Sequence, residues 1–133
     1  MSAFLLDTSA VLCHHYEERG WQRVHAILMG EDDLLIAAPS LLELRIAIQT
    51  AGGEDPEGTV TDYLEAIGSV VDITATVAKR GWAIRAASPK RIPTIDCLIA
   101  ACAAEARATL VHRDPHFSSI PAHQLKQISL DRR

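Results

Sequence analysis

The chain has 133 residues, of which 48% are hydrophobic and 23% are charged, and its formal net charge is −4. This length and balance are typical of one globular domain, so we expect a single domain over residues 1–133. No apolar run approaches the roughly 20 residues that span a bilayer, so we expect no membrane partner. A negative net charge gives no overall attraction to nucleic acid, and any such binding must come from a local basic patch or from metal ions.

The start of the chain and its cysteines predict a cytoplasmic protein. Residues 1–6 form a short apolar run without a basic segment before it, so we expect no signal peptide. Cys13, Cys97 and Cys102 lie among aliphatic residues and form no CxxC pair. This pattern is typical of buried free thiols in a reducing compartment.

Short apolar segments alternate with helical patterns along the whole chain. In chain order we expect a strand at 3–6, helices at 9–18 and 21–29, a strand at 34–38, a helix at 40–51, a loop at 52–58, a helix at 60–67, a strand at 70–73, a helix at 74–87, a loop at 88–93, a helix at 94–107, and strands at 109–111 and 127–130. Gly20 separates the first two helices, and prolines bound the second loop.

This alternation predicts an α/β fold, a mostly parallel sheet of four to five strands with helices on both faces. In such sheets, ligand sites form beyond the carboxyl ends of the strands. Asp7 and Asp114 both follow predicted strands, so we expect them to lie at one edge of the sheet.

Two carboxylates in the first half of the chain are candidate ligands. Asp7 precedes Thr8 and Ser9, so it either caps the next helix or faces a ligand. Glu43 lies about 200° around its helix from Arg45, which places it on the apolar side. A carboxylate there must be paired, protonated or bound to a metal, unless it is a rim residue that reaches solvent.

Two further carboxylates follow in the second half. Asp96 lies in the first turn of its helix, where the helix dipole alone would favour a negative charge. Small residues beside it leave room for a ligand. Asp114 precedes Pro115, and Asp-Pro is also a common turn dipeptide. The buried stripe that we expect Asp96 to border is formed by Ile95, Leu98, Ile99 and Cys102.

Together, the four carboxylates predict a metal site. Clustered carboxylates repel one another, and their charge is costly unless they are protonated or neutralised by a cation. Hard oxygen ligands select Mg²⁺ or Mn²⁺ over zinc. Such an ion orients and deprotonates a water and stabilises charge on a phosphodiester oxygen during in-line displacement. The pattern therefore favours metal-dependent hydrolysis of phosphodiester bonds.

Four motifs, in this order along the chain, resemble those of a known family. They are Leu5-Leu6-Asp7-Thr8-Ser9-Ala10, Leu42-Glu43-Leu44, Thr94-Ile95-Asp96-Cys97-Leu98-Ile99-Ala100-Ala101 and Asp114-Pro115-His116-Phe117. Together they resemble the PIN-domain family, and most closely its VapC-type toxin ribonucleases of prokaryotic toxin–antitoxin systems. The resemblance covers residues 5–130. It implies a Rossmann-like three-layer sandwich, Mg²⁺- or Mn²⁺-dependent RNA cleavage, a homodimer, and an antitoxin protein that masks the site.

The resemblance also implies roles for individual residues. The catalytic and metal-binding quartet would be Asp7, Glu43, Asp96 and Asp114. A hydroxyl of Thr8 or Ser9 would orient the first of these acids. Two positions depart from the family pattern. Members usually have Thr or Ser where this chain has His112, and many have a further acid where it has His116. These departures predict a weaker metal site around the last acid.

Histidines and basic residues near the site are candidates for accessory roles. His112 and His116 either assist the site, contact RNA, or are ordinary turn histidines. Arg85, Lys90 and Arg91 lie on both sides of the proline-bounded loop that leads to the third acid. They are the candidates for contact with the RNA backbone, and a solvated loop is the alternative.

We therefore expect an endoribonuclease, the toxin of a type II toxin–antitoxin system. A metal-dependent phosphatase or phosphotransfer domain with Asp7 as nucleophile is one alternative. Such a mechanism usually requires a second acid two residues after the nucleophile, where this chain has Ser9. A non-catalytic PIN-like interaction module is the other alternative. RNA cleavage would exclude the module, and an aspartyl-phosphate would support phosphotransfer.

A last expectation concerns the antitoxin. The helices of the first half carry the apolar segment Val11-Leu12 and the aromatic residue Trp21. Apolar faces of helices commonly form grooves for partner peptides. We expect these helices to form the groove in which the antitoxin binds.

Overall fold

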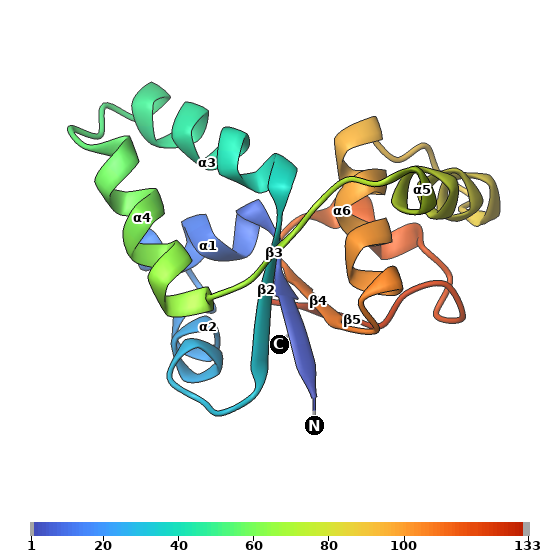
Figure 1. The fold of residues 1–133 in the computed structure, drawn as a ribbon, viewed down its shortest axis with the longest axis horizontal. Coiled ribbons are helices and arrows are strands. Elements are labelled where there is room, and N and C mark those ends of the chain that lie inside the picture. Colours follow the sequence, from blue (N-terminus) through green and yellow to red (C-terminus); the bar gives the residue numbers. More distant parts are fainter. Residues whose placement is uncertain (1, 132–133) are drawn as a thin grey trace.

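The computed structural model describes residues 2–131, which form five strands, six α-helices and one 3₁₀ helix (Figure 1). In chain order they are β1 (Ala3–Leu6), α1 (Thr8–His15), α2 (Trp21–Leu28), β2 (Asp33–Ala37), α3 (Ala38–Thr50), α4 (Pro56–Ile67), β3 (Val70–Val71), α5 (Ala75–Ala87), α6 (Thr94–Glu105), β4 (Thr109–His112), the 3₁₀ helix η1 (Pro115–Ser119) and β5 (Gln127–Ser129).

The strands form one sheet in the order β3-β2-β1-β4-β5. All four pairings are parallel, so the predicted α/β fold is confirmed. The first strand of the chain lies at the centre of the sheet, where Leu5 pairs with Leu35 of β2 and with Leu110 of β4. Residues that follow β1 and β4 therefore leave the sheet at the same edge.

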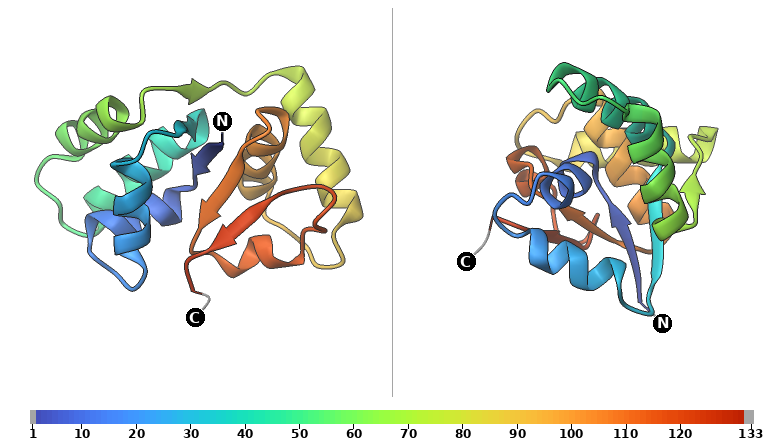
Figure 2. Two further views of the ribbon diagram at one scale, coloured as in Figure 1. Left: turned by 90° about the horizontal axis from the view of Figure 1, so that it is seen from below. Right: turned by 90° about the vertical axis from the view of Figure 1, so that its left-hand side faces the viewer.

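Helices cover both faces of the sheet, as predicted (Figure 2). Because successive strand residues point to opposite faces, Leu5 and Leu6 enter different cores. The core around Leu6 packs the sheet against α1, α2, α3 and α4. The core around Leu5 packs it against α5 and α6. The three layers are thus helices, sheet and helices.

The predicted loop at residues 52–58 is wrong at its second half, because α4 already begins at Pro56. The Asp55 carboxylate accepts a hydrogen bond from the backbone N–H of Gly58 at 2.9 Å, which caps the helix. Pro56 is the first helical residue, a position that suits proline. A side chain at position 58 would collide with the capping carboxylate, so it would have to displace the cap.

The strand that differs most from prediction is β3, which was expected at 70–73 and ends at Val71. Only Val70 and Val71 pair with β2, and Ile73 is an exposed residue beyond the strand.

The three cysteines are free and buried. Among residues 2–131, no helix has the length and apolarity that crossing a membrane requires.

Candidate metal centre

The candidate site lies beyond the carboxyl ends of β1 and β4. Asp7 directly follows β1, and its backbone N–H donates to the carbonyl of Val111 in β4 at 2.9 Å. Asp114 follows β4 by two residues. The parallel pairing of these two central strands therefore brings together two acids that are far apart in the sequence.

Asp7 caps α1 and faces the site at the same time. Its Oδ2 atom accepts hydrogen bonds from the backbone N–H of Ser9 at 3.0 Å and from the Ser9 hydroxyl. The Ser9 hydroxyl oxygen in turn accepts from the backbone N–H of Arg113 at 2.8 Å. Asp7 is only 3% exposed. One serine side chain thus ties the carboxylate after β1 to the segment that follows β4.

Glu43 accepts a hydrogen bond from Thr8, the neighbour of Ser9. The Thr8 hydroxyl donates to Glu43 Oε1 at 2.7 Å, and it lies 2.8 Å from the hydroxyl oxygen of Ser40. Because a hydroxyl carries one hydrogen, Ser40 donates to Thr8 in this chain of bonds. Thr8 thus contacts Glu43, while Ser9 contacts the carboxylate of Asp7.

The surroundings of Glu43 differ from the prediction. Its neighbours Leu42 and Ile46 are 63% and 54% exposed, so the apolar residues of α3 do not all belong to the core. Glu43 is half-buried, at the boundary between the buried residues and this exposed apolar side. Ile95 of α6, expected in a buried stripe, is likewise 42% exposed.

Asp96, Asp114 and His116 form the outer part of the site. The Nδ1 atom of His116 lies 3.0 Å from Asp114 Oδ1 and 3.3 Å from Asp96 Oδ2. One potential ligand atom from each of the three residues lies within 4.8 Å of the others, so the group could hold a metal ion. The backbone N–H of His116 also donates to Asp114 Oδ1 at 2.9 Å, which fixes the start of η1.

Burial and mutual repulsion raise the pKa of two of these acids. The pKa of Asp7 rises to about 7, mainly because its carboxyl group is buried, while the hydrogen bonds from Ser9 oppose the rise. The pKa of Asp96 rises to about 6 because of burial and the charge of Asp114, and His116 opposes this. No lysine or arginine among residues 2–131 forms an ion pair with any of the four acids. Asp7 and Glu43 are close enough to interact electrostatically with Asp96, but among residues 2–131 the ligand atoms within 4.8 Å of one another come from Asp96, Asp114 and His116. A group of carboxylates without a permanent counter-charge fits a divalent cation.

His112 takes no part in this acidic cluster. Its ring is buried, with Nε2 2.8 Å from Gln127 Oε1 and Nδ1 accepting from the backbone N–H of Asp114 at 3.2 Å. Burial lowers the pKa of His112, so the ring is neutral and its two nitrogens are both engaged. Its contact holds the backbone of Asp114 in place.

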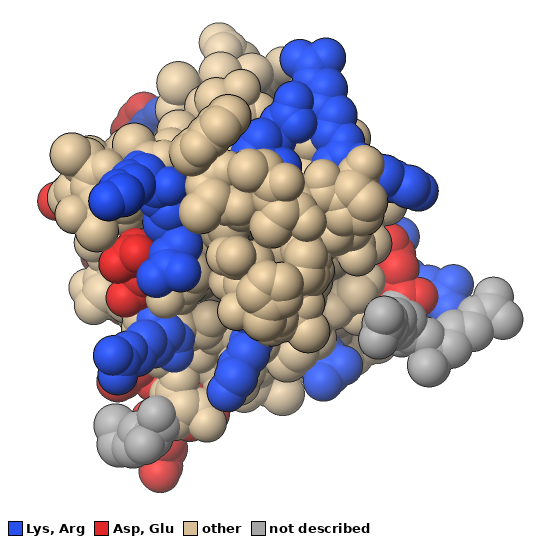
Figure 3. Space-filling view, turned by 90° about the vertical axis from the view of Figure 1, so that its right-hand side faces the viewer, with Lys and Arg blue, Asp and Glu red and all other residues tan. Residues whose placement is uncertain are grey.

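The predicted RNA-binding residues lie at the end of α5 and in the loop after it. Lys90 and Arg91 are exposed, and Arg85 in the last turn of α5 is half-buried. Figure 3 shows the side of the molecule that carries α5, where lysine and arginine side chains surround an uncharged centre. The loop leads directly into the first turn of α6, which carries Asp96.

Ser40 contributes to the site, although its place at a predicted helix start did not indicate this. Its side chain is completely buried and bonds to Thr8. Its signal in the sequence is its place three residues before Glu43, one turn away on the same side of the helix.

The sequence matches the PIN-domain family over residues 4–122. No curated protein sequence matches it significantly. Solved structures with the same fold include a chain of VapBC2 from Rickettsia felis bound to a DNA fragment from its promoter, with 20% identity, a TM-score of 0.75, and coverage of 96% of this chain and 98% of that chain. FitAcB from Neisseria gonorrhoeae gives 24% identity, a TM-score of 0.71, and coverage of 96% and 97%. VapC20 from Mycobacterium tuberculosis, described as a toxin that cleaves the sarcin–ricin loop, gives 12% identity, a TM-score of 0.68, and coverage of 86% and 92%.

Proposed function

Because this chain belongs to the PIN-domain family, we propose that it is a Mg²⁺- or Mn²⁺-dependent endoribonuclease and the toxin of a type II toxin–antitoxin system. One observation carries the proposal. Four carboxylates, Asp7, Glu43, Asp96 and Asp114, come from four separate segments to one edge of the sheet, without a lysine or arginine partner among residues 2–131. Gathering such charge is costly unless the acids are protonated or a cation neutralises them.

The four acids would hold the ion, which when bound supplies an activated water and neutralises charge on the phosphate. The chain's own hydroxyls orient two of them, Ser9 toward Asp7 and Thr8 toward Glu43. The exposed side chains of Lys90 and Arg91 would contact the phosphates of the RNA, and Arg85 would support them.

The similar structures support a toxin and an antitoxin partner. The R. felis and N. gonorrhoeae structures are named as VapBC2 and FitAcB, and a further similar structure is named as a toxin–antitoxin complex from Klebsiella pneumoniae. The M. tuberculosis protein is described as cleaving an RNA loop. By analogy we assign RNA as the substrate of this chain and an antitoxin protein as its partner, in the cytoplasm.

The phosphotransfer alternative is less well supported by the geometry. A nucleophilic Asp7 would need an accessible oxygen, but this side chain is 3% exposed and Ser9 binds its Oδ2 atom. A buried, hydrogen-bonded carboxylate is better suited to hold a cation than to attack a phosphate.

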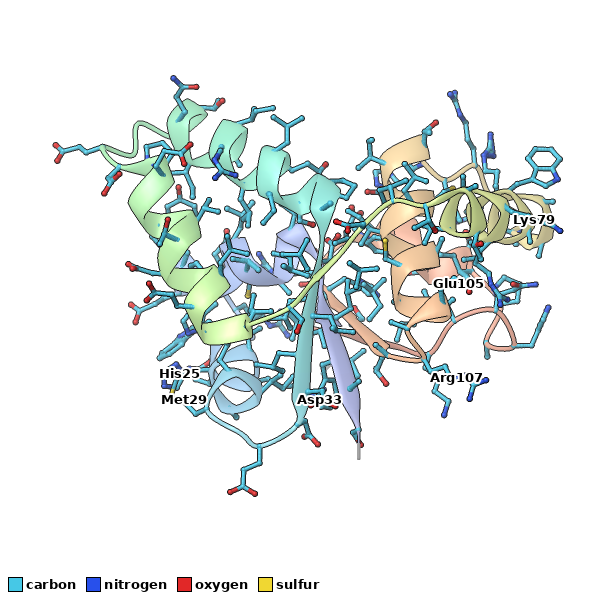
Figure 4. All side chains as sticks on the ribbon, viewed as in Figure 1. His25, Met29, Asp33, Lys79, Glu105 and Arg107 are labelled. Atoms are coloured by element: carbon cyan, nitrogen blue, oxygen red, sulfur yellow. The ribbon has the colours of Figure 1, made fainter. Side chains whose placement is uncertain are left out.

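The antitoxin would bind on the side of α1, α2 and α4. Val11 cannot contact it, because this residue is 1% exposed and belongs to the core. The same helices instead frame a groove of about 300 Å³, whose lining includes His25, Met29 and Tyr63. His25 of α2 and Met29, the residue after this helix, lie on the side of the molecule where β2 begins, away from the acidic edge (Figure 4). A homodimer would cover apolar side chains that are exposed elsewhere on the surface. These are Leu42, Ile46, Trp82 and Ile95.

An RNA-cleavage assay tests the proposal. Purified protein is incubated with tRNA, rRNA and mRNA, with Mn²⁺ or with a chelator. We expect cleavage only with the metal, and loss of cleavage in the double variant Asp7→Asn/Asp96→Asn with folding intact, because both substitutions remove a charged ligand.

The matched control for this assay is Asp33→Asn. Asp33 is an exposed acid at the start of β2, at the opposite end of the sheet (Figure 4). This variant should cleave like the wild type. Wild-type cleavage by the double variant would show that the proposed site is wrong. A phosphorylated Asp7 would instead support the phosphotransfer domain.

A further inference from the structure

The side chain of His116 occupies a position at the mouth of the acidic cluster. It is 55% exposed, whereas the side chains of Asp96 and Asp114 are 14% and 24% exposed. Its ring therefore lies on the solvent side of both carboxylates, with Nδ1 directed at an oxygen of each. The position also departs from the PIN family pattern, in which many members have an acid.

The backbone places this ring. Asp114 is the residue before η1, and its Oδ1 atom accepts from the backbone N–H of His116 at 2.9 Å. Pro115 lies between them and restricts the backbone of this turn. The imidazole is thus held near the cluster by the turn itself, in addition to its own contacts with the carboxylates.

The distances fit a shared ion. Around an octahedral ion with bonds of about 2.1 to 2.3 Å, ligand atoms at right angles lie about 3.0 to 3.3 Å apart. Nδ1 of His116 lies 3.0 Å and 3.3 Å from one oxygen each of Asp114 and Asp96. The same distances fit hydrogen bonds from a protonated imidazole, which would leave the ring outside the metal's coordination shell. These two arrangements predict opposite effects of removing the ring.

We propose that His116 is a metal ligand through Nδ1, and that this nitrogen makes the site select Mn²⁺ over Mg²⁺. The inference rests on the proposed metal site, and it concerns which ion that site holds. Mg²⁺ is a hard cation that strongly prefers oxygen ligands, whereas imidazole nitrogen suits transition-metal ions. His116 adds a nitrogen to a group whose other possible ligand atoms are carboxylate oxygens.

Metal binding is measured without RNA, so the result does not depend on nuclease activity. Isothermal titration with Mn²⁺ or Mg²⁺ alone compares the wild type with His116→Ala and His116→Asp. We expect His116→Ala to weaken Mn²⁺ binding by about 10-fold or more, and Mg²⁺ binding by much less. His116→Asp should strengthen Mg²⁺ binding and thereby remove the preference for Mn²⁺.

Pulsed electron paramagnetic resonance of the Mn²⁺-loaded protein reports the bond itself. We expect a signal from a directly coordinated nitrogen in the wild type and in the control His123→Ala, whose ring is exposed at a distant surface. Both His116 variants should bind Mn²⁺ without this signal. Far-ultraviolet circular dichroism confirms that each variant is folded.

Two results would overturn the inference. Mn²⁺ bound to the wild type without nitrogen coupling would place His116 outside the coordination shell and leave the proposed nuclease intact. An unchanged ratio of Mn²⁺ to Mg²⁺ affinity in His116→Ala would do the same. If the wild type bound neither ion, the proposed metal site would fail together with this inference.

Discussion

The two halves of the acidic site are held in different ways. In the inner half, Asp7 is buried and Glu43 half-buried, and each receives a hydrogen bond from a hydroxyl of α1. In the outer half, Asp96 and Asp114 are partly exposed and share one solvent-exposed ring, that of His116. The inner half is therefore positioned by buried hydroxyl contacts, whereas the outer half is positioned by the turn at η1 and lies open to solvent.

This difference indicates how the charge of the site is tolerated. Burial dominates for Asp7 and raises its pKa to about 7, so at neutral pH part of the metal-free protein carries a proton there. In the outer half, His116 and the partial exposure of the acids reduce the energetic cost of their negative charges. Both halves should thus respond to pH, the inner half over the wider range because the pKa of Asp7 rises to about 7 and that of Asp96 to about 6. The choice of metal should depend on the outer half.

The largest expected effect on stability is the response of the inner half to pH. The pKa of Asp7 is about 7 in the folded protein and 3.8 in an unfolded chain, so between these values the folded state binds more protons. The stability of the metal-free protein therefore falls as the pH rises from about 4 to about 7. Asp7→Asn removes the buried charge and should stabilise the metal-free protein at pH 8 by about 1–3 kcal/mol.

Urea unfolding in a chelator at pH 5 and pH 8 measures this effect. Asp33→Asn, with its exposed carboxylate, should change neither value. An Asp7→Asn variant that is less stable than the wild type at pH 8 would show that the charge of Asp7 costs the metal-free fold nothing.

A smaller effect on stability is expected from substitution of Ser9, which connects the inner half of the site to the segment after β4. Ser9→Ala removes the donor to Asp7 and leaves the backbone N–H of Arg113 without its acceptor. We expect a loss of about 1–2 kcal/mol in the free energy of unfolding, because a partly buried donor loses its partner. Cleavage should fall about 10-fold, as is usual when a residue that orients a ligand is removed.

Ser69→Ala is the control for this substitution, since Ser69 is an exposed serine at the edge of the sheet. Both variants are compared by thermal unfolding and by the cleavage assay. Equal stability and activity of the two variants would mean that the bridge through Ser9 does not position Asp7.

The smallest expected effect is on RNA affinity, outside both halves of the site. Lys90→Ala/Arg91→Ala removes two exposed charges and should leave the stability of the fold unchanged. If both residues contact phosphates, the slope of log affinity against log salt concentration for single-stranded RNA should fall by about 1.4. Fluorescence anisotropy in the cleavage-inactive Asp7→Asn background measures this slope. The control is Lys126→Ala, because Lys126 lies at the other end of the sheet. An identical slope in both variants would show that the loop with Lys90 and Arg91 does not contact RNA phosphates.

The sheet and most helices could be predicted because their signals are local. Apolar runs with turn residues at their ends identified all five strands, and the helix expected at 74–87 is α5, which Thr74 caps. The start of α4 was missed because two glycines before it suggested a loop, although Asp55 and Pro56 are a common pair at a helix start.

The exposure of apolar helix residues could not be predicted in the same way. Ile46 and Ile95 follow helical periodicity, but the structure leaves both open to solvent. Periodicity shows which residues share a side of a helix, and only the packing of the helices decides which side is covered. The position of His116 between two carboxylates was also beyond the sequence, because it depends on how η1 turns back toward α6.

The pairing of β1 with β4 has a consequence for protein synthesis. Ser9 is synthesised long before the Arg113 backbone that it contacts, which is 104 positions later in the chain. The central strand must likewise wait for residues 109–112 before its second neighbour is available. A nascent chain that ends before β4 therefore cannot assemble the acidic edge of the sheet, and the activity proposed for this protein can begin only after β4 has been synthesised.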